Sequence, residues 1–482
     1  MGTPVPHSHD GRSGPDSTNA TDGPELLPQA GFYNRHMKYL FKTAGGAALL
    51  ALVGGVALAD VAKLPTSTRY DVEYPTVAYS EAATQNRIYR LQKKLDSGEV
   101  KLDWEPRFGY LLSLLKALEI DVDSQVLVFS RTSLQIEHIS PATPRAVFFN
   151  DDTYVGFVQN SPLIELAAVD RDKGTVFYGF ENRREFEPEF SREGGRCLTC
   201  HDTYSMGGGG VPRVMVLSSP VDHPRDQRNL TAGTDVDDST PFSQRWGGWY
   251  VTGNMGARTH LGNLALAEGR GGAKLRELAD QAHNLETLDQ YFDTSRYPSN
   301  KSDVVALTVL EHQTRLHNAI TRVSFKVRTV LEREDTGTAA STLRSWSDIS
   351  PRDHKRLQQM MEPLVRYLFL ADAAPFEDRM VGSSSFSERF QTLGPRDRKG
   401  RSLRELDLQT RLFKYPLSYT IYSEQFDALP EYARDYIETR IVEVLKGEDT
   451  TGLSDLLTPE QRKVIAEILI DTKPSIAARL RK

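Results

Sequence analysis

Two cysteines and a histidine form the clearest chemical motif of the chain. The only cysteines are Cys197 and Cys200, and His201 follows the second one directly. The pattern C-x-x-C-H is the attachment sequence for c-type haem. Two thiols about one helical turn apart can reach the two vinyl groups of one porphyrin, and the adjacent imidazole is then placed as proximal iron ligand. The spacing therefore predicts one covalent haem c held by these three residues.

Three other uses of the cysteines are weighed against this prediction. A thioredoxin-like C-x-x-C motif opens a helix beside a βαβ unit, whereas here a predicted meander and the residues Gly194-Gly195-Arg196 precede the first thiol. A disulfide between residues this close closes a small loop and adds little stability. A zinc site needs a fourth ligand from elsewhere in the chain. Haem attachment is the interpretation that we favour.

The second axial ligand of the iron is expected to be a methionine or a histidine. Its identity matters for function, because a thioether raises the reduction potential and a second imidazole lowers it. Gly253 and Gly256 flank Met255 and permit close approach, and His260 follows shortly after. We expect Met255 or His260 to be the sixth ligand, with an ordinary packed side chain as the alternative for each. The other candidates are Met206, Met215, Met360, Met361, Met380, His138, His223, His283, His312, His317 and His354.

Aromatic and basic side chains offer further contacts to a porphyrin. Those that could shield it from water, or else form plain core, are Trp246, Trp249 and Tyr250. A guanidinium pairs bidentately with carboxylate, so the candidates for the haem propionates are Arg213, Arg245 and Arg258. His312 and His317 are spaced so that they point to different faces of one helix, and an interior polar role is the alternative for both.

Two further stretches join the cysteine motif in carrying a resemblance to a known family. They are 245–253, RWGGWYVTG, and 310–314, LEHQT, with His317 and Asn318 after it. With the motif at 197–201, they make the chain similar to bacterial periplasmic single-haem c-type cytochromes, of a long and poorly characterised kind that contains a cytochrome c domain. The resemblance implies that Cys197 and Cys200 carry the thioethers and that His201 is the proximal ligand. The chain departs from small cytochromes c, whose haem domain is short and almost entirely helical.

From the motif and the resemblance we expect an exported cytochrome that transfers single electrons to or from a redox partner protein. One alternative is a haem enzyme, a peroxidase or small-molecule oxidase, with an open distal position and a polar group such as His260 or His312 beside it. Another is a haem-based sensor module. No catalytic residue is assigned from the sequence.

The N-terminal region predicts export. Residues 1–36 are polar and rich in Gly, Pro and Ser, which predicts disorder, or else a start assigned too early with Met37 as the true first residue. Residues 37–59 combine a positive start, the apolar run 47–58 and an A-x-A ending at Ala59, as in a signal peptide or N-terminal anchor. We expect a periplasmic or exported protein, with inner-membrane attachment through 43–59 if this segment is retained.

The amino-acid composition disfavours some classes of protein function. Lys plus Arg is 59 and Asp plus Glu is 65, which gives a net charge of −6. A nucleic-acid-binding role is disfavoured, because backbone phosphates need a concentrated positive surface. With 39% hydrophobic and 26% charged residues, the bulk of the chain is typical of an ordinary globular protein.

Apolar periodicity predicts an α+β fold, with a β-meander-rich first half that carries the haem motif and an α-helical second half. We expect a haem-binding domain at 60–265 and a mostly helical domain at 266–482. In the first, two helices fall within 85–121, and the predicted strands are 126–129, 146–149, 154–158, 163–169, 176–180 and 211–217. In the second, the predicted helices are 304–331, 351–371, 402–413, 430–446 and 459–472, with a loop over 376–402.

Overall fold

The computed structural model describes residues 77–130, 133–202, 210–219, 233–264, 282–333, 342–343 and 346–482. All of them belong to one compact unit, Pro65–Lys482. The extension predicted at 1–36, the signal peptide or anchor predicted at 37–59 and the domain boundary predicted at 265 lie outside the described residues. In the described part, no helix combines the length and the apolar character needed to cross a bilayer.

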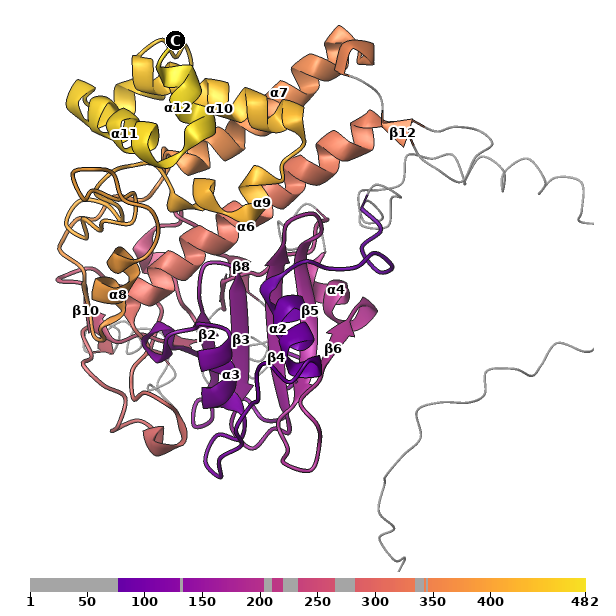
Figure 1. The fold of residues 1–482 in the computed structure, drawn as a ribbon. Helices are drawn as coiled ribbons and strands as arrows, with labels where there is room; N and C mark the ends of the chain where they lie inside the picture. Colours follow the sequence, from indigo (N-terminus) through magenta and orange to yellow (C-terminus); the bar gives the residue numbers. More distant parts are fainter. Residues whose placement is uncertain are drawn as a thin grey trace, which may run out of the picture. The chain divides into compact units, whose positions relative to one another are not determined.

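A seven-stranded antiparallel sheet forms the centre of the first half (Figure 1). Its strand order is β6-β5-β4-β3-β2-β1-β9. The bounds of these strands are β1 Val126–Val128, β2 Arg145–Phe149, β3 Thr153–Val158, β4 Leu163–Asp170, β5 Gly174–Glu181, β6 Phe190–Glu193 and β9 Trp249–Tyr250. Short two-residue strands pair outside this sheet, namely β7 Leu217–Ser218 with β8 Thr234–Asp235, β10 Gly253–Asn254 with β13 Val381–Gly382, and β11 Glu332–Arg333 with β12 Thr342–Leu343.

The two faces of the sheet bury different cores, because successive side chains of a strand point to opposite faces. Phe148 and Tyr178 belong to a cluster with α2 (Arg87–Asp96) and α3 (Leu111–Ala117). Phe149 and Phe177 belong to a larger cluster that includes α6 (Val304–Leu331). The meander thus separates two helical layers, and its α6 face is the one that carries the candidate site.

Helix α6 is the structural link between the two halves. It has 28 residues, about 42 Å at 1.5 Å per residue, and most of its side chains are buried. Figure 1 shows it running between the sheet and the C-terminal helices. Those helices and the shorter ones of the described chain are α4 Gly195–His201, α7 Pro351–Leu368, α8 Phe386–Thr392, α9 Glu424–Asp427, α10 Glu431–Lys446, α11 Pro459–Thr472 and α12 Pro474–Leu480. Single turns of 3-10 helix include η2 Val122–Ser124, η8 Tyr419–Tyr422 and η9 Ser454–Leu456.

The α+β class is confirmed, with the antiparallel sheet in the first half and helices in the second. Two predicted elements are wrong. Of the predicted strand 211–217 only Leu217 lies in a strand, β7, because Arg213 donates its N–H to the carbonyl of His201 instead of to a neighbouring strand. The predicted helix 402–413 is irregular, because the Asp407 carboxylate accepts the backbone N–H groups of Gln409 and Thr410 and so folds the chain into a turn.

The predicted loop 376–402 is also corrected in part. It contains β13 and the helix α8, in which Phe386 and Phe390 are buried on one face. Residues one helical turn apart lie on the same side of a helix, so these two rings form a single apolar patch. The surrounding polar residues concealed this signal in the sequence.

Candidate haem-binding site

The short helix α4 places the three motif residues on one side. It follows directly after the edge strand β6 and ends at His201. Cys200 and His201 are three and four positions after Cys197, and residues at these spacings share a helix face. Cys197 is half-buried and Cys200 is exposed. The structure therefore brings together all three residues that the motif predicts, and of the two thiols Cys200 is the more open to solvent.

The imidazole of His201 is oriented by the main chain. Its Nδ1 lies 2.8 Å from the carbonyl oxygen of Arg213, and because a carbonyl only accepts, Nδ1 is the donor. The ring of Phe177 packs against it with 4.6 Å between ring centroids. A proton held on Nδ1 leaves the lone pair on Nε2, which is the tautomer that a metal-ligating histidine uses. Among the described residues, Nε2 makes no hydrogen bond.

Electrostatics keep this imidazole neutral. Burial lowers the pKa of His201 to about 4, and the hydrogen bond to the Arg213 carbonyl opposes this shift only in part. The positive charges of Arg145 and Arg213 lower the pKa further, while Glu165 raises it. Because only a neutral imidazole can coordinate iron, His201 is ready to act as a ligand over the whole physiological pH range.

An ion pair lies on the same face of the sheet as Phe177. Arg145 of β2 and Glu165 of β4 are 3.1 Å apart, and each side chain is one quarter exposed. Gly156 of β3 lies opposite Glu165 in the register, so the Arg145 side chain crosses over a position without a side chain. Sequence reasoning missed this pair. The available signal was a charged residue at an inward position of two otherwise apolar strands.

Of the three arginines predicted for the propionates, Arg213 is the one next to His201. Its side chain is fully buried and bonds Asp235 at 3.0 Å. Arg245 instead pairs with Glu311 of α6 at 2.9 Å, and Arg258 packs over the rings of Phe242 and Phe376. Arg213 is thus the one of the three that lies beside α4, where its guanidinium pairs with Asp235, whereas the other two arginines are not brought to this helix.

Met255 and His201 follow segments that contact α6 at two widely separated points along its axis. The segment beside His201 is tied to α6 by Asn318, whose amide donates to the carbonyl of Val214 at 2.8 Å. The segment before Met255 is tied to the start of α6, where Val304 donates to the carbonyl of Thr252 at 2.9 Å. These two contacts are about 21 Å apart at 1.5 Å per residue. Met255 is itself fully buried in the core, so the structure does not bring it to the motif.

His260 lies between these two regions and is also buried. Its ring packs against Trp246 at 5.3 Å, and the Trp246 indole donates to Glu311, about 10 Å along α6 from Asn318. Burial lowers the pKa of His260 to about 4. Nε2 makes one long contact of 3.4 Å to the His283 carbonyl. The structure thus places His260 in the core, away from α4.

The two histidines of α6 use both ring nitrogens in hydrogen bonds. His312 bonds Asp238 through Nδ1 and Ser418 through Nε2, each at 2.8 Å. This chain has the order of a catalytic triad, but Ser418 is fully buried and caps η8, so it joins elements rather than exposing a nucleophile. His317 bonds Gln425 and the carbonyl of Asp151, also at 2.8 Å each. Both histidines are satisfied interior residues.

The predicted aromatic cluster belongs to the core. The indole of Trp249 donates to the Leu217 carbonyl at 2.8 Å, and the Tyr250 hydroxyl donates to the Pro141 carbonyl at 2.7 Å. Trp246, Trp249 and Tyr250 are each at most 5% exposed. Met206 and His223 lie outside the described residues, and Met215 is half-buried two positions after Arg213.

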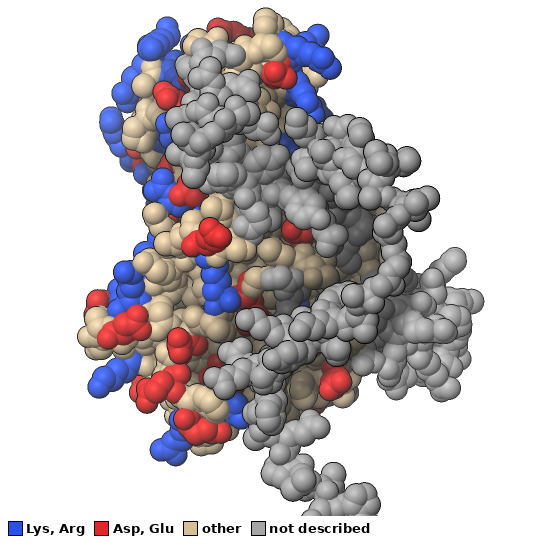
Figure 2. Space-filling model, turned by 90° about the vertical axis from the view of Figure 1, so that its right-hand side faces the viewer, with Lys and Arg blue, Asp and Glu red and all other residues tan. Residues whose placement is uncertain are grey.

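The described surface and its metal chemistry add two observations. On the face drawn in Figure 2, basic and acidic side chains both occur across the part that is not grey. Within the described ranges, no group of three or more His, Cys, Asp or Glu side chains is placed to hold a bare metal ion.

Comparison of the chain with protein-family models, curated proteins and solved structures gave no match.

Proposed function

We propose that this protein is an exported c-type cytochrome that holds one covalent haem on α4 and transfers single electrons to or from a partner protein. The observation that supports this most is the hydrogen bond from His201 Nδ1 to the Arg213 carbonyl, made by an imidazole that shares its helix face with two thiols. This bond satisfies the Nδ1–H donor, and it is also the contact that fixes a proximal ligand in the tautomer whose Nε2 lone pair faces the metal.

When bound, the haem supplies an iron that cycles between two oxidation states. The chain's own residues do the rest. Cys197 and Cys200 hold the ring through thioethers, His201 offers Nε2, and the Arg213 carbonyl stops the imidazole from rotating. Arg213 and the Arg145–Glu165 pair set the local charge, and charge near the iron tunes its reduction potential.

The positions of the predicted distal groups bear on the haem-enzyme alternative, which needs a polar side chain beside the open face of the iron. Both ring nitrogens of His312 form hydrogen bonds, to Asp238 and Ser418, and His260 lies in the core beside Trp246. Neither residue lies beside α4, so neither is placed to assist a substrate at the iron. The location that we propose is the periplasm, with residues 37–59 as signal peptide or inner-membrane anchor.

The test is covalent attachment in a host with c-type haem maturation machinery. The full chain is purified and measured by pyridine haemochrome assay and intact mass, beside the variant Cys197→Ser/Cys200→Ser and the control Leu456→Ser, whose residue is exposed and lies in no site described above. We expect one haem in the native chain and the control, and none in the cysteine variant. A colourless native chain with the mass of the polypeptide alone would overturn the proposal.

Carbon monoxide separates the carrier from the enzyme. A reduced low-spin spectrum that carbon monoxide does not change supports electron transfer through a six-coordinate iron. A high-spin ferric form that binds carbon monoxide once reduced, and turns over peroxide, would refute the carrier and establish the haem enzyme instead.

A further inference from the structure

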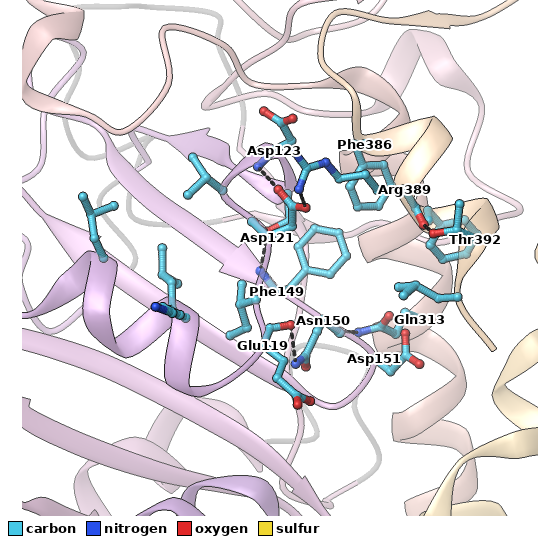
Figure 3. A pocket seen from close by; sticks show the side chains of 18 residues that line it. Glu119, Asp121, Asp123, Phe149, Asn150, Asp151, Gln313, Phe386, Arg389 and Thr392 are labelled. Atoms are coloured by element: carbon cyan, nitrogen blue, oxygen red, sulfur yellow. Dashed lines mark hydrogen bonds and ion pairs between the residues drawn. The ribbon is translucent and has the colours of Figure 1, made fainter. Parts of the chain in front are cut away.

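A cavity of about 810 Å³ opens on the described surface away from α4. It lies between α3, η2, the end of β2 and α8, and Figure 3 shows the side chains around it. Its volume is within the usual range of small-molecule sites, roughly 300–1,000 Å³. The residues used below are Leu112, Asp121, Asp123, Phe149, Asp151, Phe386, Arg389, Phe390 and Leu393, all of which line it.

One wall of the cavity is aromatic. The rings of Phe149 and Phe386 lie 5.7 Å apart, and Phe386 stacks on Phe390 at 5.7 Å with 22° between the ring planes. Leu112 and Leu393 also line the cavity, yet they are 38% and 50% exposed. A ligand that covers these two exposed leucines would remove apolar surface from water, which lowers the free energy of the complex. The cavity therefore suits an apolar, ring-shaped molecule.

The polar part of the wall holds four carboxylates, those of Glu119, Asp121, Asp123 and Asp151, beside the cations Lys116 and Arg389. Asp121 pairs with Arg389, and Asp151 pairs with Arg404. Asp123 accepts the hydroxyl of Ser385. Asp121 also accepts the backbone N–H of Asp123. A carboxylate has two oxygens with about four acceptor sites, so these partners leave each of the three carboxylates with capacity for another donor. Because Asp121 and Asp151 already have cationic partners, a neutral hydroxyl fits them better than a second positive charge.

We propose that this cavity binds a small aromatic molecule that carries hydroxyl groups, of which a dihydroxybenzene is the simplest example. Its ring packs against the wall of Phe149, Phe386 and Phe390, and its hydroxyl groups donate to the carboxylates of Asp121, Asp123 or Asp151. The site needs no haem, so it goes beyond the proposed electron transfer and does not rest on it.

The cavity lies at the end of β2 between α3 and α8, and through Phe149 it reaches the α6 face of the sheet, on which His201 also lies. Phe149, Tyr154, Ala167 and Phe177 are successive partners in the sheet register. Phe149 lines the cavity and Phe177 packs against the His201 ring. Three strand spacings separate the two phenylalanines, about 14 Å. A ligand in the cavity would thus lie at one end of a residue row whose other end contacts the candidate haem site.

The experiment titrates 1,4-dihydroxybenzene into the purified full chain under anaerobic conditions and follows heat or ligand-observed NMR. We expect saturable binding at one site. Leu393→Trp fills the mouth of the cavity and weakens binding at least tenfold. Leu456→Trp is the matched control, since Leu456 is 52% exposed and does not line the cavity, and it leaves binding unchanged. Near-ultraviolet circular dichroism checks that both variants fold, and Leu112→Trp replaces Leu393→Trp if the latter does not.

Two further probes test the ligand class. We expect 1,4-dimethoxybenzene, which has the ring without donors, to bind at least tenfold more weakly than the diphenol. Phenethylammonium should also bind more weakly, because it brings a cation in place of a hydroxyl. The proposal is overturned if the diphenol shows no saturable binding, if the mouth variants bind like the control, or if either comparison probe binds as tightly as the diphenol.

Discussion

His201 and Arg213 hold each other through two hydrogen bonds. The imidazole Nδ1 donates to the Arg213 carbonyl at 2.8 Å, and the Arg213 N–H donates to the His201 carbonyl at 3.1 Å. Both bonds use the backbone of Arg213, so they do not depend on the identity of its side chain. The orientation of the imidazole is consequently present in the folded polypeptide before any cofactor is attached.

The first prediction concerns the protonation of His201 in the haem-free chain. In a Cys197→Ser/Cys200→Ser variant, nitrogen NMR of the ring should show the tautomer with hydrogen on Nδ1 at pH 7. The ring should take up a proton only near pH 4, because burial lowers its pKa. The same ring in urea should titrate near 6.5, the ordinary histidine value. An Nε2-protonated ring at pH 7 would contradict the predicted ligand geometry.

The second prediction concerns acid stability and His260. Its pKa is about 4 in the folded chain and about 6.5 when unfolded, so between these values the unfolded state binds more protons. Stability due to the buried neutral ring is therefore complete above pH 6.5 and is lost as pH falls toward 4, by up to about 3 kcal/mol. Urea unfolding at several pH values should show a shallower loss for His260→Phe. Equal slopes for both proteins would show that this ring does not contribute.

The third prediction uses the buried pair Arg245–Glu311. Arg245 is 2% exposed and Glu311 is fully buried, and Glu311 also accepts the Trp246 indole. Burial raises the pKa of Glu311 to about 8 even beside Arg245, so after Arg245→Met the buried carboxyl stays protonated at pH 7. The free energy of unfolding should fall by about 1–3 kcal/mol, the cost of leaving a buried polar group without its partner. The double variant Arg245→Met/Glu311→Leu should recover part of this loss. Denaturant melts measure both values, and additive losses in the double variant would exclude coupling between the two side chains.

The fourth prediction tests the axial ligand expected from the sequence. Because the structure places Met255 in the core near the start of α6, Met255→Leu should leave the absorption bands of the haem-loaded chain unchanged. The swap is close to volume-conserving and should cost less than about 1.5 kcal/mol of stability. His260→Phe should also leave the bands unchanged. A change of spin state in either variant would identify that residue as the iron's sixth ligand and require the chain to rearrange around the haem.

The elements that the sequence predicts well are those with local and redundant signals. Five strands of the meander have alternating or continuous apolar residues bounded by turn residues, and the predicted helix 304–331 coincides with α6. The segments that failed depend on contacts that apolar periodicity does not show, from a neighbouring strand in one case and from a local side chain in the other. The strand β6 has little apolar content of its own and forms because β5 offers it an edge, and residues 402–413 lose a predicted helix to the side chain of Asp407.

The candidate site likewise has a part that the sequence predicts and a part that it does not. Cys197, Cys200 and His201 are adjacent in sequence, so their chemistry is readable without a structure. The residues that surround them come from β2, β4 and the segment after α4, and no pattern within Arg145, Glu165 or Arg213 links them to the motif. The flanking glycines Gly253 and Gly256 suggested Met255 as a ligand, but the path of α6 decides where that side chain lies, and long-range packing of this kind is not encoded in local sequence.

The helix α4 follows the outermost strand of the sheet, and this strand, β6, has only four residues. At the opposite border β9 has two. Strands this short are poor templates for a foreign strand, which protects the sheet from stacking edge to edge with another molecule. The helix α4, which carries the cysteines, can therefore lie beside an edge of the sheet without that edge promoting strand pairing with further copies of the chain.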